Sequence, residues 1–271
     1  MDSEKKLGER VVLIRGAGEM ASGVAHRLCR SHFRVCLLEI EHPLAVRREV
    51  SFCEAAYEGE KEVEGIRARL VAFPREIPSA WKEVKIPLLI DPDGKNTREY
   101  LQPDVVIDAI LAKRNLGTRL ADAPFVIGLG PGFCAGKEVH AVIETNRGHN
   151  LGRVILSGSA EPDTGIPGEI GGFSVERVLR TLKTGSFRPQ KSIGDPVNKG
   201  EVVAVVDDYP IIAMISGVIR GLLREGVSAK KGMKVGDIDP RGKRELCFSI
   251  SEKARAIGGG VLEAILYRFN Q

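Results

Sequence analysis

The chain has 271 residues, enough to bury a substantial core in one large or two ordinary domains. A hydrophobic content of 43% and a charged content of 28% exclude a disordered or fibrous protein. The 40 basic and 36 acidic residues are interspersed and aromatic residues make up 5%, so neither a nucleic-acid footprint nor a base-stacking surface is predicted.

Cellular location and metal binding are constrained by the apolar runs and the cysteines. The first ten residues are largely charged, and no apolar run approaches the roughly 20 residues of a membrane span. The five cysteines form no C-x-x-C pair, and His140 has no partner at ligand spacing. We therefore expect a cytoplasmic protein with no membrane partner, no disulfide framework and no metal site.

The most informative segment is an apolar run at residues 11–15 that breaks into the glycines of 16–18 and continues as an amphipathic pattern. This order predicts a strand, a tight turn and a helix. A phosphate at such a turn would meet free N–H groups at the helix N-terminus. The residues expected to contact it are Gly16, Gly18, Glu19 and Met20.

A second apolar strand, Val35 to Leu38, ends in Glu39. Its distance from Gly16 is near the roughly 20-residue offset of the acid that binds a ribose 2′-hydroxyl in dinucleotide-binding units. Strand, glycines, helix, strand and acid together predict a Rossmann-type β-α-β unit. The alternative is a structural turn whose glycines serve packing alone.

Cations and a second glycine-rich loop follow. Residues 128–137 fail as a Walker A motif, since Pro131 and Glu138 occupy defining positions, but the glycines could still bring backbone amides to an anion. Solvated basic side chains and a structural turn are the alternative interpretations. The candidate ligand-binding residues of these segments are Arg47, Lys113, Arg114, Gly130, Gly132 and Lys137.

Residues 157–172 form a long loop of particular composition, and structureless loops of this length usually bind a ligand or are disordered. Its candidate binding residues include Ser159, Glu161 and Thr164. A helix is expected after the loop, with Ser174 as N-cap and an apolar stripe from Val175 to Leu182. A hydrated surface loop is the alternative.

An internal repeat follows, because residues 194–206 are echoed by residues 226–238. The region resembles the biotinyl/lipoyl hammerhead barrel, but no lysine lies between Lys199 and Lys230, so it has no residue to attach a biotin or lipoyl group. We expect a barrel used for packing or docking.

The expected fold class is α/β: a Rossmann-like parallel-sheet domain over residues 1–186, a hammerhead-like β domain over 187–250 and a C-terminal helical segment over 251–271 that packs back. The glycines at 258–260 either split this last segment or permit a close backbone contact.

Residues 14–23, 139–149 and 157–172, with the terminal barrel, resemble the YqeB family. That resemblance implies an accessory role in the maturation of selenium-dependent molybdenum hydroxylases. The N-terminal half is more distantly similar to the Rossmann domain of xanthine dehydrogenase accessory proteins, which handle molybdenum cofactor. The implied ligand is a molybdopterin dinucleotide, and the implied partner is the apo-hydroxylase.

Three hypotheses remain at this stage. The first is a maturation factor that binds an anionic, nucleotide-bearing ligand. The second is an NAD-dependent oxidoreductase with Glu39 on the ribose and His140 or Lys113 as proton donor. The third is a docking scaffold without a ligand. The sequence leaves catalytic residues, homo-oligomerisation and enzymatic activity itself open.

Overall fold

The computed structural model describes residues 5–270. The chain forms two compact units. Unit 1 contains the chain up to Pro43, Ser51–Asp163 and the residues from Ile250 on, and unit 2 contains Leu44–Val50 and Thr164–Ser249. The chain thus leaves unit 1 twice and returns to it twice.

Unit 1 is built on a nine-stranded sheet with the order β10-β9-β7-β6-β1-β2-β5-β4-β3. The strands from β4 to β9 in that order pair in parallel, whereas β3 and β10 pair antiparallel at the two edges. The bounds are β1 (Val11–Arg15), β2 (Arg34–Glu39), β3 (Glu60–Val63), β4 (Ile66–Leu70), β5 (Lys85–Ile90), β6 (Val105–Asp108), β7 (Phe125–Leu129), β9 (Ala141–Ile143) and β10 (Val154–Ile155).

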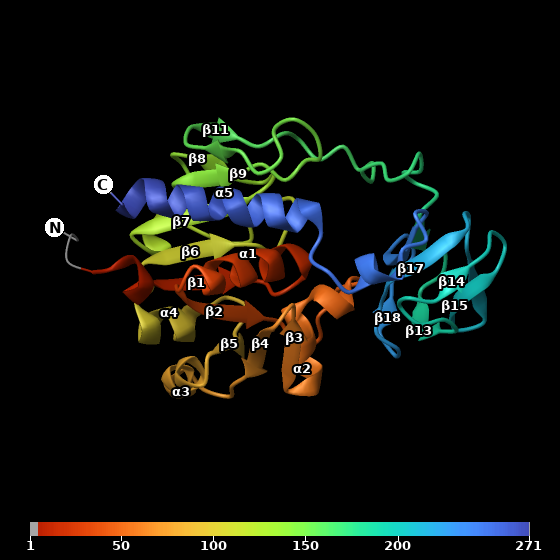
Figure 1. Cartoon of the computed structure of the whole chain (residues 1–271), viewed down its shortest axis with the longest axis horizontal. Coiled ribbons are helices and arrows are strands. Elements are labelled where there is room, and N and C mark those ends of the chain that lie inside the picture. The colour runs from red at the N-terminus through yellow and green to blue at the C-terminus, as the bar shows by residue number, and fades with distance from the viewer. Residues whose placement is uncertain (1–4, 271) are drawn as a thin grey trace. The chain divides into compact units, whose positions relative to one another are not determined.

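The helices of unit 1 are α1 (Glu19–Arg30), α2 (Ala55–Glu58), α3 (Ile77–Lys82), α4 (Lys95–Leu101) and α5 (Glu252–Phe269). Figure 1 shows α5 alongside α1. The close approach needs glycines: a Cβ on Gly23 would lie 2.7 Å from the Cβ of Ala254, and one on Gly258 would lie 3.0 Å from the carbonyl oxygen of Gly23. The glycines at 258–260 therefore leave α5 continuous and permit contact.

The strand, glycine turn and helix predicted at residues 11–30 are present, as is the strand predicted at 35–38. The fold class is nevertheless wrong. The sheet contains both parallel and antiparallel pairs. In a doubly wound domain each connection between parallel strands contains a helix, whereas two of the connections here do not. Between β6 and β7 lies only a 3-10 helix (Leu120–Asp122), and between β7 and β9 lies the short strand β8 (Cys134–Ala135), which pairs with β11 (Gly158–Ser159).

Unit 2 consists of two four-stranded antiparallel sheets, β12-β19-β17-β14 and β16-β15-β13-β18. Its core includes Phe187, Val203, Ile219, Leu223 and Ile238. The strands are β12 (Val178–Arg180), β13 (Gly185–Pro189), β14 (Pro196–Val197), β15 (Val202–Val206), β16 (Tyr209–Ile212), β17 (Gly217–Leu222), β18 (Ser228–Ala229) and β19 (Lys234–Asp239).

These two sheets correct the expectation of a hammerhead barrel. Each copy of the sequence repeat does form a two-residue strand, a turn and a longer strand, as β14–β15 and β18–β19. The unit, however, begins at Thr164 rather than at residue 187, and it recruits Leu44–Val50.

The helix expected after Ser174 is absent from the described chain. Val178 and Leu179 instead pair in β12 with β19 and are buried, while Val175 and Leu182 are 57% and 62% exposed. The apolar stripe therefore does not cover one helical face. Within residues 5–270, no helix is both long and apolar enough to cross a membrane.

Candidate functional site

The candidate site of unit 1 is the turn between β1 and α1, which we call the glycine turn (residues 16–20). Gly16 adopts φ +94° and lies so close to residues 109–110 that a Cβ would be 3.1 Å from the carbonyl oxygen of Ala109. Gly18 is the N-cap of α1 without a side-chain capping bond, and no atom lies within 4 Å of where its Cβ would be. The first N–H groups of α1 lack intrahelical partners and carry the positive end of the helix dipole.

A buried polar network lies at the carboxyl ends of β1 and β6, next to the glycine turn. Arg15, the last residue of β1, donates from a terminal nitrogen to Asp108 Oδ2 at 3.2 Å and also to Thr118 Oγ1. The Thr118 hydroxyl donates to the same Asp108 oxygen at 2.5 Å. All three residues are buried, so this network fixes the carboxyl ends of β1 and β6.

Glu39 lies at the carboxyl end of β2 and reaches the glycine turn. Its Oε2 accepts a hydrogen bond from the Ala17 amide at 2.8 Å, and its Oε1 accepts one from the Ile40 amide at 2.9 Å. Burial raises the pKa of Glu39, and these two backbone bonds oppose the shift. Each oxygen retains a second lone pair that can accept a hydroxyl.

Lys253, in the first turn of α5, is a candidate that the sequence did not indicate. Burial, followed by the charge of Arg147, lowers its pKa, while the carboxylates of Glu19 and Glu144 act in the opposite sense. The Glu144 carboxylate is itself fixed, because it accepts from the amides of Thr145, Asn146 and Glu161 at 2.7 Å each. The lysine is therefore partly buried and within electrostatic range of Glu19, the first residue of α1.

Several predicted residues follow the carboxyl ends of neighbouring strands. Lys113 and Arg114 come after β6, and a Cβ on Gly132 would lie 2.7 Å from the backbone of Arg114 and 2.9 Å from the carbonyl carbon of Lys113. Lys113 adopts φ +60° and pairs with Asp163 at 2.7 Å. Such strained backbone is typical of functional loops.

Other candidates serve local structure. The Gly130 amide donates to the Ile143 carbonyl at 2.8 Å, and a Cβ there would collide with Thr145. The Met20 side chain is buried, which leaves its backbone alone to face a ligand. Glu161 accepts hydrogen bonds from the side-chain amides of Asn146 and Asn150. Ser159 pairs in β11 with Cys134.

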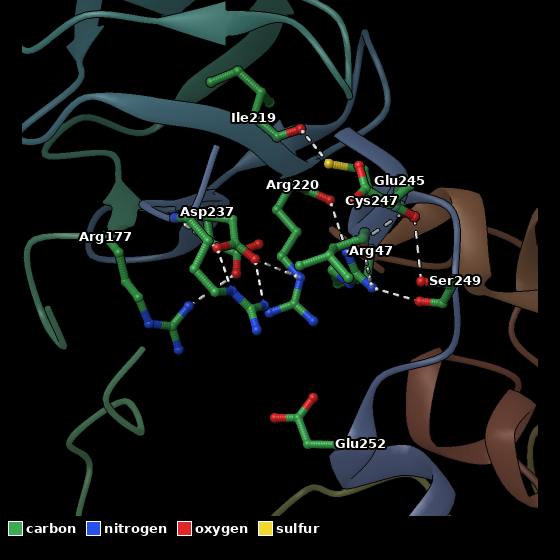
Figure 2. A network of polar contacts seen from close by, with 12 residues as sticks. Arg47, Arg177, Ile219, Arg220, Asp237, Glu245, Cys247, Ser249 and Glu252 are labelled. Carbon is green, nitrogen blue, oxygen red and sulfur yellow. Dashed lines mark hydrogen bonds and ion pairs between the residues drawn. The ribbon is translucent and has the colours of Figure 1, made fainter. Parts of the chain in front are cut away.

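Three predicted ligand residues have surroundings other than the glycine turn of unit 1. Arg47 is in unit 2, where its buried terminal nitrogens donate to the carbonyls of Arg220, Leu246 and Ser249 at 3.2–3.3 Å (Figure 2). Thr164 also belongs to unit 2. Lys137 precedes β9 near His140, whose amide donates to Val126 at the amino-terminal part of β7. It therefore lies toward the strand ends opposite the glycine turn.

A hollow of about 490 Å³ lies at the other end of α1. It is lined by Gly23, His26, Arg27, Arg30, Ser31, Glu64, Ile250 and Arg255. Arg255 forms two hydrogen bonds to Glu64 at 2.7 and 2.8 Å, and burial lowers the pKa of His26. No sequence motif indicated this hollow.

Comparison with known proteins identifies one curated relative. The chain is 48% identical over 264 residues to the uncharacterized protein YqeB of Escherichia coli (strain K12). The predicted resemblance to the YqeB family is thus supported. The match covers 97% of this chain but 49% of YqeB, so the chain spans about half the length of that relative. No family model matches the chain.

Solved structures offer distant likenesses. An aspartoacylase family protein from Mesorhizobium loti is 15% identical, with 84% of each chain covered and a TM-score of 0.28. A succinylglutamate desuccinylase from Silicibacter sp. is also 15% identical, with the same coverage and a TM-score of 0.25. At these scores the likeness supports no argument about fold or chemistry.

Proposed function

We propose that this chain binds the phosphate of a nucleotide-bearing ligand at the glycine turn. The observation that carries the proposal is the start of α1, where no side chain caps the helix and the space beside Gly18 is open. Backbone donors and a helix dipole make such a terminus an anion site. Lys253 adds a cation, and Glu39 can accept a ribose hydroxyl beside it.

We further propose a role in the maturation of a selenium-dependent molybdenum hydroxylase in the cytoplasm. The support is the resemblance to the YqeB family stated from the sequence, which the match to YqeB covers over 97% of the chain, together with the uncapped start of α1 in unit 1. The ligand would then be a molybdopterin dinucleotide, and the apo-hydroxylase would be its recipient. In this role the chain holds and transfers a cofactor.

Glu39 favours a second candidate, an oxidoreductase that uses NAD. Its carboxylate is held against the Ala17 amide, beside the place proposed for the phosphate, and each oxygen keeps one lone pair for a hydroxyl. A negative carboxylate at this position would repel a 2′-phosphate. This candidate therefore requires binding of NAD in preference to NADP.

The test compares the melting temperature and calorimetric binding with NAD, NADP, CTP, AMP and molybdopterin cytosine dinucleotide, because a ligand of the native state raises apparent stability. Gly18→Asp should abolish binding, since it places a negative side chain in the open space. Gly259→Asp is the matched control: its Cβ also meets no atom within 4 Å, and it lies in α5.

Selective binding of the cytidine ligands would support the maturation role, and selective binding of NAD would support the oxidoreductase. Failure of every ligand, or equal binding by wild type and Gly18→Asp, would overturn the site and leave the docking scaffold.

A further inference from the structure

Unit 2 contains a buried cation that its own residues leave unsatisfied. Arg220 is in β17 and is 5% exposed to solvent. Its one ion pair within residues 5–270 joins Nε to Asp239 Oδ2 at 3.7 Å, and the buried Nε donates no hydrogen bond there. A guanidinium removed from water without hydrogen bonds is costly, because the lost hydration is not replaced.

The carboxylate nearest to Arg220 is already used. Arg241 donates from Nε to Asp239 Oδ1 at 2.9 Å and from a terminal nitrogen to Oδ2 at 2.7 Å. Burial alone would raise the pKa of Asp239, but these hydrogen bonds hold it below its usual value. Asp239 therefore stays charged and serves Arg241 first.

Two neighbouring arginines, Arg177 and Arg47, differ from Arg220 in that their terminal nitrogens have acceptors. Arg177 donates to Asp237 Oδ2 at 3.0 Å and to the Gly168 carbonyl at 3.0 and 3.2 Å. Arg47 donates to backbone carbonyls, including that of Arg220. Figure 2 shows the Arg177, Arg220 and Arg47 guanidinium groups below the strand that carries Ile219. Around Arg220, therefore, other guanidinium groups have found acceptors.

The arginine cluster of unit 2 (Arg47, Arg177, Arg220 and Arg241, with Asp237 and Asp239) contains four cations and two carboxylates. An oxyanion beside Arg220 would supply the acceptors that its guanidinium lacks. Planar guanidinium groups bind such oxyanions through two parallel hydrogen bonds.

We propose that Arg220 is the centre of a second anion site, in unit 2, which binds a phosphate group through the terminal nitrogens of its guanidinium. Asp239 and Arg241 act as positioning residues that hold this guanidinium in place. The ligand class is inorganic phosphate or a small phosphate monoester. This site belongs to unit 2 and does not depend on the function proposed for the glycine turn.

The test is a phosphate titration followed by calorimetry and melting temperature, with the ionic strength held constant by potassium chloride. It uses the Gly18→Asp background, so that the glycine turn contributes little. The Gly18→Asp protein with Arg220 intact should bind phosphate. Adding Arg220→Met should weaken this binding at least about tenfold, the loss expected for a charge-assisted bidentate contact. The control, Arg188→Met, removes an exposed arginine of β13 and should change nothing.

A second variant guards against misfolding. Arg220→Lys keeps the charge but not the planar fork, so it should fold and still bind phosphate more weakly. Glycerol 3-phosphate distinguishes the two sources: binding of inorganic phosphate indicates a free ion, and binding of the ester alone indicates the phosphate of a larger ligand. No binding of either compound, or unchanged binding in both Arg220 variants, would overturn the proposal.

Discussion

The glycine turn of unit 1 and the arginine cluster of unit 2 would offer an anion different donors. At the glycine turn the donors are backbone N–H groups of α1, which the fold itself orients. In the arginine cluster they are long side chains held by carboxylates and carbonyls. The first arrangement presents backbone donors above a buried Arg15–Asp108 ion pair, whereas the second presents a guanidinium, that of Arg220, whose Nε donates no hydrogen bond.

This difference determines how each site depends on its surroundings. Removing the Glu39 carboxylate from the glycine turn should leave two backbone amides without an acceptor but no cation without a carboxylate. Removing a carboxylate from the arginine cluster should leave buried cations uncompensated, which is among the most destabilising changes known for single residues. The following substitutions test this contrast.

The largest effect is expected for Asp239→Asn, which removes the negative charge that serves Arg241 and Arg220. We expect the free energy of unfolding to fall by about 3–5 kcal/mol, as in other broken buried ion pairs. Urea denaturation would measure it. The control is Asp208→Asn. The side chain of Asp208 is 85% exposed and pairs with Lys183, so its replacement should have no measurable effect. Equal effects in both variants would contradict the contrast.

A smaller loss is expected in unit 1 from Gly23→Ala. The added methyl group would lie 2.7 Å from the Cβ and 2.9 Å from the carbonyl oxygen of Ala254, so α5 must shift. We expect a loss of about 1–3 kcal/mol, which outweighs the better helix propensity of alanine. Gly259→Ala, where the same atom meets open space, should be neutral or stabilising by denaturation.

The glycine turn itself separates two roles of glycine. Gly16→Ala should cost about 1–3 kcal/mol, because φ +94° is strained for alanine and its Cβ would crowd Ala109. Gly18→Ala should stay within about 0.5 kcal/mol of wild type. Thermal unfolding of the two variants would check this order, and a larger loss at Gly18 would show that its space is filled.

The smallest effect concerns His26 in the hollow of unit 1. Burial keeps the folded-state pKa below the ordinary value of 6.5, so the unfolded chain binds more protons below that pH. Stability should therefore fall as the pH falls from 6.5 toward the lowered pKa. His26→Gln should flatten this dependence in urea denaturation at about pH 7.5 and about pH 5.5. An unchanged slope would exclude His26 as its source.

Local patterns allowed the beginning of the chain to be predicted. The apolar run, glycines and helical spacing of residues 11–30 lie next to one another, so neighbouring residues determine the structure. The helix predicted from the apolar residues between Val175 and Leu182 is absent, because the same spacing also occurs by chance around a short strand. Pairing of β12 with β19, which is distant in sequence, overrode it.

The fold class and the arginine cluster depend on long-range contacts. No local signal shows that the segment between β6 and β7 lacks an α-helix, or that Leu44–Val50 joins unit 2. Arg15 and Arg220 did carry a signal, since each is a charged residue within an apolar strand. Lys253 carried none, because its neighbours Glu19 and Glu144 are brought near only by the tertiary fold.

The packing of α5 on α1 also bears on the order in which the protein can fold during synthesis. The ribosome makes α1 first, then all of unit 2, and α5 after both. The face of α1 at Gly23 must therefore await its partner while the intervening residues emerge. A nascent chain halted before Ile250 would display this face uncovered, which makes it a natural binding surface for chaperones during translation.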